Sequence, residues 1–223
     1  VRATAAEVGA TLAEVADSCK MGKFEIPADG QRFTIETPDG RHAVTIPAIG
    51  QHQRANFALA WLAADKLGAG EVDAGGIASR LSALRLPGCF ESIKTAPRVI
   101  VDTSQSRTAY RALERTLRET RPAALHVLAT LDGGTDVESL TETLTSLSAP
   151  TSVAFHPDDR ALADSLAGEL RERGLPVQLA GRPGPALEQL AAAAPRDTVL
   201  VFGARRPTAD ARSHLLALEQ DPG

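Results

Sequence analysis

Three short polar stretches contain residue types that can bind a small molecule, and each follows an apolar segment of strand-like composition. They are Asp102-Thr103-Ser104-Gln105, Asp132-Gly133-Gly134-Thr135 and His156-Pro157-Asp158-Asp159. Carboxylates, hydroxyls, amides and imidazoles all form hydrogen bonds with ligands. In open α/β sheets, ligands bind beyond the carboxyl ends of the strands. We therefore expect a ligand site where these stretches leave their strands.

Other polar residues give weaker signals. His126 lies inside an apolar segment and is expected to be a core or edge histidine. Arg205 and Arg206 are expected to form a solvated charge cluster, and Asp136 is expected to cap the helix that follows it. His156 stays open between a structural and a functional role, because it stands at a strand end.

Several common motifs are absent from the 223 residues. The only Gly-Lys pair, Gly22-Lys23, is followed by Phe24 and has no glycine five residues earlier, so there is no phosphate-binding P-loop. No G-x-G-x-x-G opens a helix after a strand, and there is no H-E-x-x-H, paired-cysteine or G-x-S-x-G motif. The sequence therefore favours neither a standard dinucleotide-binding domain nor a hydrolase, and it offers no metal-ligand spacing.

The second half of the sequence alternates short apolar strands with amphipathic helices. Strands are expected at Val99–Asp102, Leu125–Thr130, Ser152–Phe155, Val177–Leu179 and Thr198–Phe202, and helices at Thr108–Thr120, Val137–Leu147, Arg160–Arg173, Pro185–Ala193 and Ala209–Leu218. Such an alternation requires a parallel sheet covered on both faces. We therefore expect an α/β fold with a Rossmann-like, doubly wound, mostly parallel sheet in this half.

The first half has a different pattern. Helical spacing at Thr4–Val15 precedes alternating strands around two turn signals, Asp29-Gly30 and Asp39-Gly40, which together predict a β meander. Residues 51–68 then form a helical pattern that ends at a glycine. Its expected apolar face consists of Phe57, Ala60, Trp61 and Ala64. A second helix is expected at Ala74–Leu84, and Pro87-Gly88 is the expected hinge or domain boundary.

Composition limits the partners and the compartment. The net charge is -4, from 24 basic and 28 acidic residues, and no basic face is interleaved with aromatic residues, so a nucleic-acid partner is not expected. No apolar run approaches the ~20 residues of a membrane span, so no membrane association is expected. We expect a cytoplasmic protein with Cys19 and Cys89 as free thiols. The first residue, Val1, suggests that the sequence starts inside a longer gene product.

Three stretches, in order, resemble motifs of one known family. They are GQHQRANFALA (50–60), LPGCFE (86–91) and VIVDTSQSRTAYRALERTL (99–117). The chain resembles the folylpolyglutamate synthase and dihydrofolate synthase branch of the Mur ligase family, whose motifs read roughly G-x-H-Q-x-x-N-A-x-x-A, P-G-R-F-E and D-G-A-H-N-P. The resemblance covers nearly the whole chain. It implies that residues 1–86 are the C-terminal part of a central ATPase domain and that residues 87–223 are the C-terminal domain.

The resemblance also implies an activity. The family joins a carboxylic acid to an amino acid, glutamate in this branch, with ATP and Mg²⁺, and this branch belongs to folate biosynthesis and one-carbon metabolism. The partners would be a small-molecule acid, an amino acid, and an N-terminal P-loop portion or a partner subunit. The resemblance assigns nucleotide contacts to Asn56, His52 and Asp102. Asn56 is the only asparagine in the chain, and its amide can donate to and accept from a purine edge at the same time.

Two parts of the resemblance are degenerate. Cys89 replaces the family's arginine, and a thiol cannot supply a cationic fork to phosphate oxygens. The loss of one such preorganised group typically costs ~100- to 1,000-fold in rate. In the third motif, Gln105, Ser106 and Arg107 replace histidine, asparagine and proline. Ser104, Gln105 and Arg107 remain candidates for substrate or phosphate contacts, and no catalytic residue is assigned.

Two functions stay open at this stage. The first is the C-terminal portion of a folylpolyglutamate synthase-like ligase, which is not competent alone because it lacks the P-loop. The alternative is a non-catalytic relative, a partner subunit or scaffold, in which the fold survived the loss of the catalytic arginine and histidine. A free-standing small-molecule binding domain is a third and weaker reading. The first part, 1–86, is expected to be poorly stable by itself, because helices that would cover its meander are partly missing.

Overall fold

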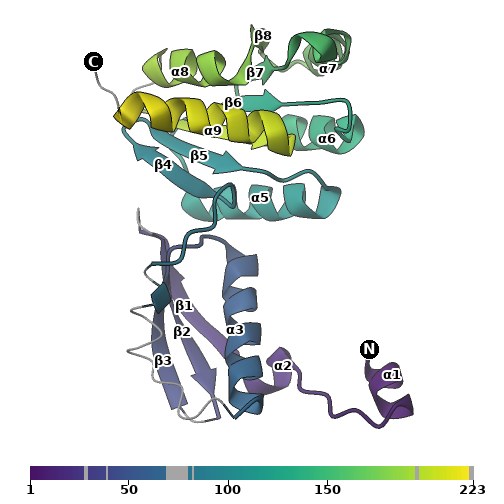
Figure 1. Ribbon diagram of the computed structural model, residues 1–223, viewed down its shortest axis with the longest axis vertical. Coiled ribbons are helices and arrows are strands. Elements are labelled where there is room, and N and C mark those ends of the chain that lie inside the picture. Colours follow the sequence, from purple (N-terminus) through teal and green to yellow (C-terminus); the bar gives the residue numbers. More distant parts are fainter. Residues whose placement is uncertain (28–29, 39, 69–79, 82, 194–195, 221–223) are drawn as a thin grey trace. The chain divides into compact units, whose positions relative to one another are not determined.

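The computed structural model divides the chain into two compact units, Val1–Arg85 and Leu86–Gly223 (Figure 1). It describes the whole chain except residues 28–29, 39, 69–79, 82, 194–195 and 221–223. The expected helix at Ala74–Leu84 therefore lies mostly outside the described residues, as do Asp29 and Asp39 of the two expected turns. None of the helices in the described part of the chain has the length and apolar character needed to cross a membrane.

The first unit is a three-stranded antiparallel sheet with one long helix. Its elements are α1 (Arg2–Glu7), α2 (Val15–Ser18), β1 (Lys20–Glu25), β2 (Gln31–Thr37), β3 (Gly40–Ile46) and α3 (Gln51–Lys66). The strands lie in the order β1-β2-β3, with antiparallel pairing throughout. The expected meander followed by a helix is thus present.

The expected helix at Thr4–Val15 is wrong over most of its length. Helix α1 ends at Glu7, and Gly9 adopts a left-handed conformation with φ of 66°. No residue of α1 is buried, so no packing against the unit opposes the break that this glycine introduces. Residues 10–14 are irregular before α2 begins.

Helix α3 is where the sequence predicts it, but its buried face is rotated. Arg54, Ala58, Trp61 and Leu62 are buried, whereas Ala60, which the sequence places on the apolar face, is exposed. The two aromatic residues of the expected face do contact the sheet: the Phe57 ring lies 5.5 Å from that of Phe33 on β2, and the Trp61 ring lies 4.9 Å from that of His42 on β3, between centroids. Large rings contribute far more buried area than alanine, so they set the face that α3 turns to the sheet.

The second unit is a six-stranded, mostly parallel sheet, as the sequence predicts. Its strands are β4 (Glu91–Thr95), β5 (Arg98–Asp102), β6 (Leu125–Thr130), β7 (Thr151–Ala154), β8 (Val177–Gly181) and β9 (Thr198–Gly203). They lie in the order β4-β5-β9-β6-β7-β8. Only the pairing of β4 with β5 is antiparallel.

Helices cover this sheet in the expected α/β arrangement (Figure 1). They are α5 (Arg107–Thr120), α6 (Val137–Leu147), α7 (Arg160–Glu172), α8 (Pro183–Ala193) and α9 (Arg205–Gln220). Residues of α8 and α9 pack in one core cluster with Val99 and Val101 of β5 and Val199 and Val201 of β9. Tyr110 of α5 packs edge-on against Phe202 at 5.7 Å between ring centroids. β5 and β9 therefore contribute nearly continuous apolar side chains, as a doubly covered sheet requires.

Strand β4 has no counterpart among the sequence predictions. It is an edge strand whose residues are all partly or fully exposed, and Ile93 is its one residue that packs against the core cluster. A short edge strand of mixed polar residues lacks the apolar run by which the other five strands can be recognised. Its pairing with β5 places the LPGCFE stretch next to the end of β5.

Candidate functional site

In the first unit, the start of helix α3 is fixed by a buried glutamine. Gln31 of β2 is fully buried, and its Nε2 donates hydrogen bonds to the carbonyl oxygens of Ala48, at 2.6 Å, and Gly50, at 3.2 Å. Gly50 precedes α3 and has φ of 119°, in the region that favours glycine. The glutamine therefore holds the segment from which the helix starts.

A buried arginine continues this support into the helix. Arg54 is 6% exposed, and its Nη1 donates to Oε1 of Gln31 at 2.8 Å. Its guanidinium carbon also lies 3.9 Å from the centre of the Phe24 ring, which adds a cation–π contact. Because Arg54 faces inward, the residues on the opposite side of this turn face solvent.

His52 and Asn56 occupy that outer side, one helical turn apart. Both are exposed, as i and i+4 residues on one face of α3. Asn56 Nδ2 donates to Gln53 Oε1 at 3.3 Å, which is a long hydrogen bond. The amide oxygen and the second N–H hydrogen of Asn56 remain suited to a ligand. The arrangement can present a donor and an acceptor together, which is the pattern that a purine edge recognises.

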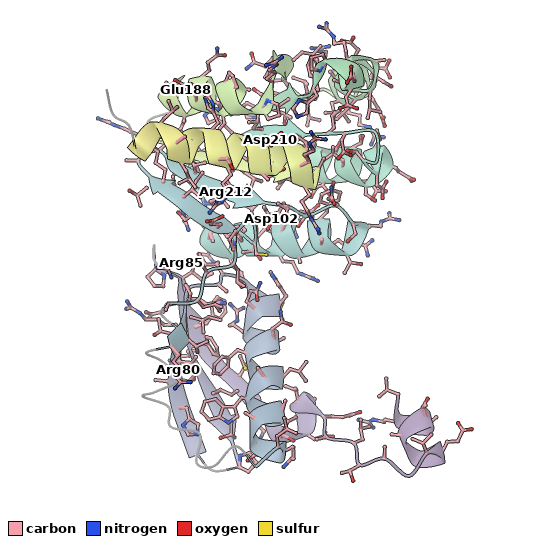
Figure 2. The ribbon with its side chains drawn as sticks, viewed as in Figure 1. Arg80, Arg85, Asp102, Glu188, Asp210 and Arg212 are labelled. Carbon is pink, nitrogen blue, oxygen red and sulfur yellow. The ribbon has the colours of Figure 1, made fainter. Side chains whose placement is uncertain are left out.

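In the second unit, Asp102, which is labelled in Figure 2, ends strand β5. Its carboxylate forms hydrogen bonds with nearby residues. The residue is 8% exposed. Its Oδ2 accepts from the backbone N–H of Phe90 at 2.9 Å, and its Oδ1 accepts from the backbone N–H of Ser104, also at 2.9 Å, and from the Ser104 hydroxyl. The carboxylate therefore joins the turn before β4 to the loop after β5.

The same two segments are joined a second time through Thr103. Its backbone N–H and its hydroxyl both donate to the carbonyl oxygen of Gly88, at 2.8 and 3.1 Å. Gly88 has φ of 70°, and a Cβ at this position would lie 2.7 Å from Cγ2 of Thr103. Two stretches that match the family motifs are thus in direct contact, and we call residues 86–91 and 102–106 together the β4–β5 latch.

Glu91 anchors the latch to helix α9. Its carboxylate accepts two hydrogen bonds from Arg212, both 2.7 Å long, and one from the backbone N–H of Gly88 at 2.9 Å. Burial raises the pKa of Glu91, but the hydrogen bonds from Arg212 and Gly88 outweigh burial and hold that pKa below its ordinary value. This pair was not predicted from the sequence. Glu91 stands in the LPGCFE motif, but Arg212 lies 121 residues further along the chain, where no local pattern points to it.

Cys89, which occupies the place of the family's arginine, is exposed and not in a disulfide, and Cys19 is buried and likewise forms no disulfide, as expected. Desolvation by burial, together with the negative charges of Asp102 and Glu91, raises the pKa of the Cys89 thiol. The side chain is therefore neutral at pH 7 and brings no positive charge to this turn.

The remaining candidates of the third motif lie in and after the loop that follows β5. Ser104 is partly exposed and bonded to Asp102, whereas Gln105 is exposed. Arg107 is the first residue of α5, and its Nη2 lies 2.9 Å from each carboxylate oxygen of Glu142 on α6. This pair is about half exposed and thus contributes little to stability, so a ligand anion can compete for the guanidinium.

The other strand ends have mainly structural contacts. The Asp136 side chain accepts from the backbone N–H of Ser139 at 3.1 Å, which confirms the expected helix cap. His156 Nε2 lies 3.2 Å from a carboxylate oxygen of Asp210 on α9, and His126 Nε2 lies 2.8 Å from Asp197. Across the described residues, no three or more acidic, histidine or cysteine side chains gather in a way that would hold a metal ion.

No protein-family model matches the sequence, and no curated protein matches it. Solved structures do resemble it. A Mycobacterium tuberculosis folylpolyglutamate synthase complexed with ADP and AMPPCP superposes with a TM-score of 0.76 at 22% identity, over 96% of this chain and 51% of that chain. The apo form of the Lactobacillus casei folylpolyglutamate synthetase gives a TM-score of 0.71 at 22% identity, over 97% and 49%.

A more distant ligase has the same arrangement. UDP-N-acetylmuramate-alanine ligase from Thermotoga maritima superposes with a TM-score of 0.67 at 15% identity, over 92% of this chain and 46% of that chain. The chain thus spans about half the length of the solved structures that it resembles. The resemblance found in the sequence is confirmed at the level of the fold: the chain folds like about half of a folylpolyglutamate synthase or a related Mur ligase, as a C-terminal portion would.

Proposed function

We propose that this chain is the C-terminal portion of a folylpolyglutamate synthase-like, ATP-dependent ligase that joins a carboxylic acid to an amino acid, with glutamate as the expected amino acid. The observation that carries the proposal is the similarity of fold over 96% of the chain, together with three motifs in the family's order. In this account the protein acts in the cytoplasm, in folate and one-carbon metabolism.

The nucleotide contact in the first unit rests on helix α3. Asn56 is the residue proposed to face adenine, with His52 one turn earlier on the same exposed face. Gln31 and Arg54 act as positioning residues, because they fix the start and the rotation of the helix. Their burial is consistent with this role, since a rigid helix presents an amide more accurately than a loop does.

In the second unit, Asp102 is proposed to contribute to nucleotide binding indirectly, by fixing the conformation of the loop that follows β5. Both of its oxygens are already occupied by hydrogen bonds from Phe90 and Ser104. Gln105 and Arg107, which are exposed beyond Asp102, are better placed to contact substrate or phosphate oxygens. Gln105 stays uncharged near neutral pH, so of these two residues Arg107 is the one that can provide positive charge. Arg205 of α9 is a second cation whose charge acts on Cys89 of the latch.

ATP with Mg²⁺ would supply the phosphoryl group that activates the carboxylate of the acid. Asn56 and His52 fit the adenine end of ATP, but the triphosphate end needs more than these 223 residues offer. The sequence has no P-loop, and Cys89 replaces the cationic residue of the hinge motif. We therefore assign the triphosphate and the metal ion to a P-loop portion or to a partner subunit.

The proposal is tested by measuring ADP release with folate and glutamate, using the parent gene product and the 223-residue chain in parallel. We expect turnover by the parent and none by the 223-residue chain alone, because binding of a triphosphate depends on a backbone cradle that this sequence lacks. Clear turnover by the 223-residue chain would contradict the proposal. ATP binding by the parent without any ADP release would favour the non-catalytic alternative instead.

A further inference from the structure

A cavity of about 400 Å³ opens at the amino-terminal edge of the six-stranded sheet. It is lined by the first residues of β7 and β8, by His126 near the start of β6, and by Leu190 of α8. Its volume falls within the roughly 300–1,000 Å³ typical of small-molecule pockets. The site is separate from the β4–β5 latch: at ~3.3 Å per residue, the length of β6 from His126 to Thr130 puts about 13 Å between the two edges of the sheet.

Two prolines form rigid rims for this cavity. Pro150 and Pro176 each precede a strand, and their carbonyl oxygens accept hydrogen bonds from the backbone N–H groups of Val127, at 2.9 Å, and Thr151, at 3.0 Å. Proline has a fixed φ and no N–H group, so the rims are stiff and bring no unsatisfied donor into the cavity. With Val177 and Leu190 they supply the apolar part of the wall.

The polar part of the wall offers both donors and acceptors. Gln178 Nε2 donates to Ser152 Oγ at 2.9 Å, which leaves the Ser152 hydroxyl hydrogen and the Gln178 amide oxygen for a ligand. The three side chains His126, Ser152 and Gln178 belong to neighbouring strands. The contact of His126 Nε2 with Asp197 at 2.8 Å orients the imidazole, and its second nitrogen remains available.

The charge of the wall selects the class of ligand. Among the residues that the structure describes, no lysine or arginine side chain lines the cavity. Arg171 is not part of the lining, but it donates from Nε and Nη2 to the carbonyl oxygen of Val177, at 3.2 and 3.0 Å. The carboxylate of Asp197 already pairs with His126. An anionic ligand would thus meet no cationic side chain in the wall itself, since Arg171 is engaged with the Val177 carbonyl, and it would lie near the carboxylate of Asp197. We propose that this cavity is a second binding site, which takes a small uncharged molecule with an amide or hydroxyl group attached to an apolar ring.

The test uses benzamide as the probe and benzoate as its charged counterpart, each titrated into the isotope-labelled 223-residue chain by NMR. Benzamide is expected to cause saturable shifts at the amides of Val127, Ser152 and Gln178, with a Kd on the order of 1 mM, as suits so few atoms. Benzoate is expected to bind at least about fivefold more weakly, because the cavity has no cationic partner for its carboxylate.

Two matched variants complete the experiment. Gln178→Leu removes the amide that faces the cavity and should raise the Kd for benzamide at least about fivefold, the cost of one lost hydrogen bond. Gln189→Leu makes the same change at an exposed position of α8, next to Leu190, and should leave the Kd for benzamide unchanged. The NMR spectra of both variants report whether they fold. Absence of saturable shifts at these amides, equal binding of benzoate, or an unchanged Kd in Gln178→Leu would each overturn the proposal.

Discussion

The motif residues of the two units are used in opposite ways. In the first unit, His52 and Asn56 face solvent, and the support for them comes from other residues, Gln31 and Arg54, that are buried beneath the helix. In the second unit, Asp102 is itself buried and bonded within the β4–β5 latch. A motif residue can thus persist because it meets a ligand or because it holds a turn, and its burial and hydrogen bonds distinguish the two cases.

The largest effect is expected where the motif residue itself is structural. Asp102→Ala removes the acceptor of three hydrogen bonds and leaves the buried N–H of Phe90 without a partner. We expect the free energy of unfolding of the second unit to fall by about 3–4 kcal/mol. Urea unfolding followed by circular dichroism measures this loss.

Asp158→Ala is the matched control for Asp102→Ala. Asp158 also stands beyond a strand end, but it is exposed, so its removal should change stability by less than about 0.5 kcal/mol. Equal effects of the two substitutions would mean that Asp102 is not a structural residue, and the contrast between the units would then disappear.

A smaller loss is expected when the support of α3 is removed. Gln31→Leu deletes the hydrogen bonds to Ala48 and Gly50 and the contact with Arg54, so the first unit should lose about 2–3 kcal/mol of unfolding free energy. Trp61 is the only tryptophan and is buried in this unit, so its fluorescence reports the transition. The control is Gln51→Leu, at an exposed position at the start of α3. If Gln51→Leu unfolded at as low a urea concentration as Gln31→Leu, the proposed role of Gln31 would be refuted.

The smallest effect is expected from the pH dependence of the Glu91–Arg212 pair. Because the pKa of Glu91 is lowered in the folded chain, its stabilising contribution is fully present above the unfolded-state pKa, about 4.5, and is lost as the pH falls through the folded-state pKa. The urea midpoints of the wild type and Glu91→Gln should therefore differ most near pH 7, and the difference should shrink as the pH falls below 4.5 and through the lowered pKa of Glu91. The exposed carboxylate change Glu142→Gln is the control. If the difference between the two urea midpoints stayed constant with pH, the charge of Glu91 in its pair with Arg212 would not be the cause of the stabilisation.

The sequence predicted the strands of the second unit well because they share one feature. β5, β6, β7 and β9 are short apolar runs between amphipathic helices, and burial on both faces demands that composition. β8 is the other edge strand and is only partly buried, but it keeps apolar Val177 and Leu179 between two helices. β4 was missed because an edge strand needs only one apolar contact, through Ile93. The helix at Thr4–Val15 was wrong because periodicity alone does not show whether a helix has a surface to pack against.

The candidate site was predictable only in part. The motifs pointed to Asn56, His52 and Asp102 because each belongs to a continuous stretch of sequence. Their supporting partners did not appear, because Gln31 is 23 residues from Arg54 and Glu91 is 121 residues from Arg212. Such pairs arise only when the sheet brings distant segments together. The sequence also could not show that the Asp102 carboxylate is already occupied.

The most direct test of the central claim is an ATP titration of the parent gene product with and without Asn56→Ala, with Gln51→Ala on the same helix as the control. Asn56→Ala is expected to raise the Kd for ATP about tenfold, the cost of one or two hydrogen bonds to the base, whereas Gln51→Ala should leave it unchanged. An unchanged Kd in Asn56→Ala, with ATP still bound tightly, would contradict the assignment of the exposed face of α3 to the nucleotide.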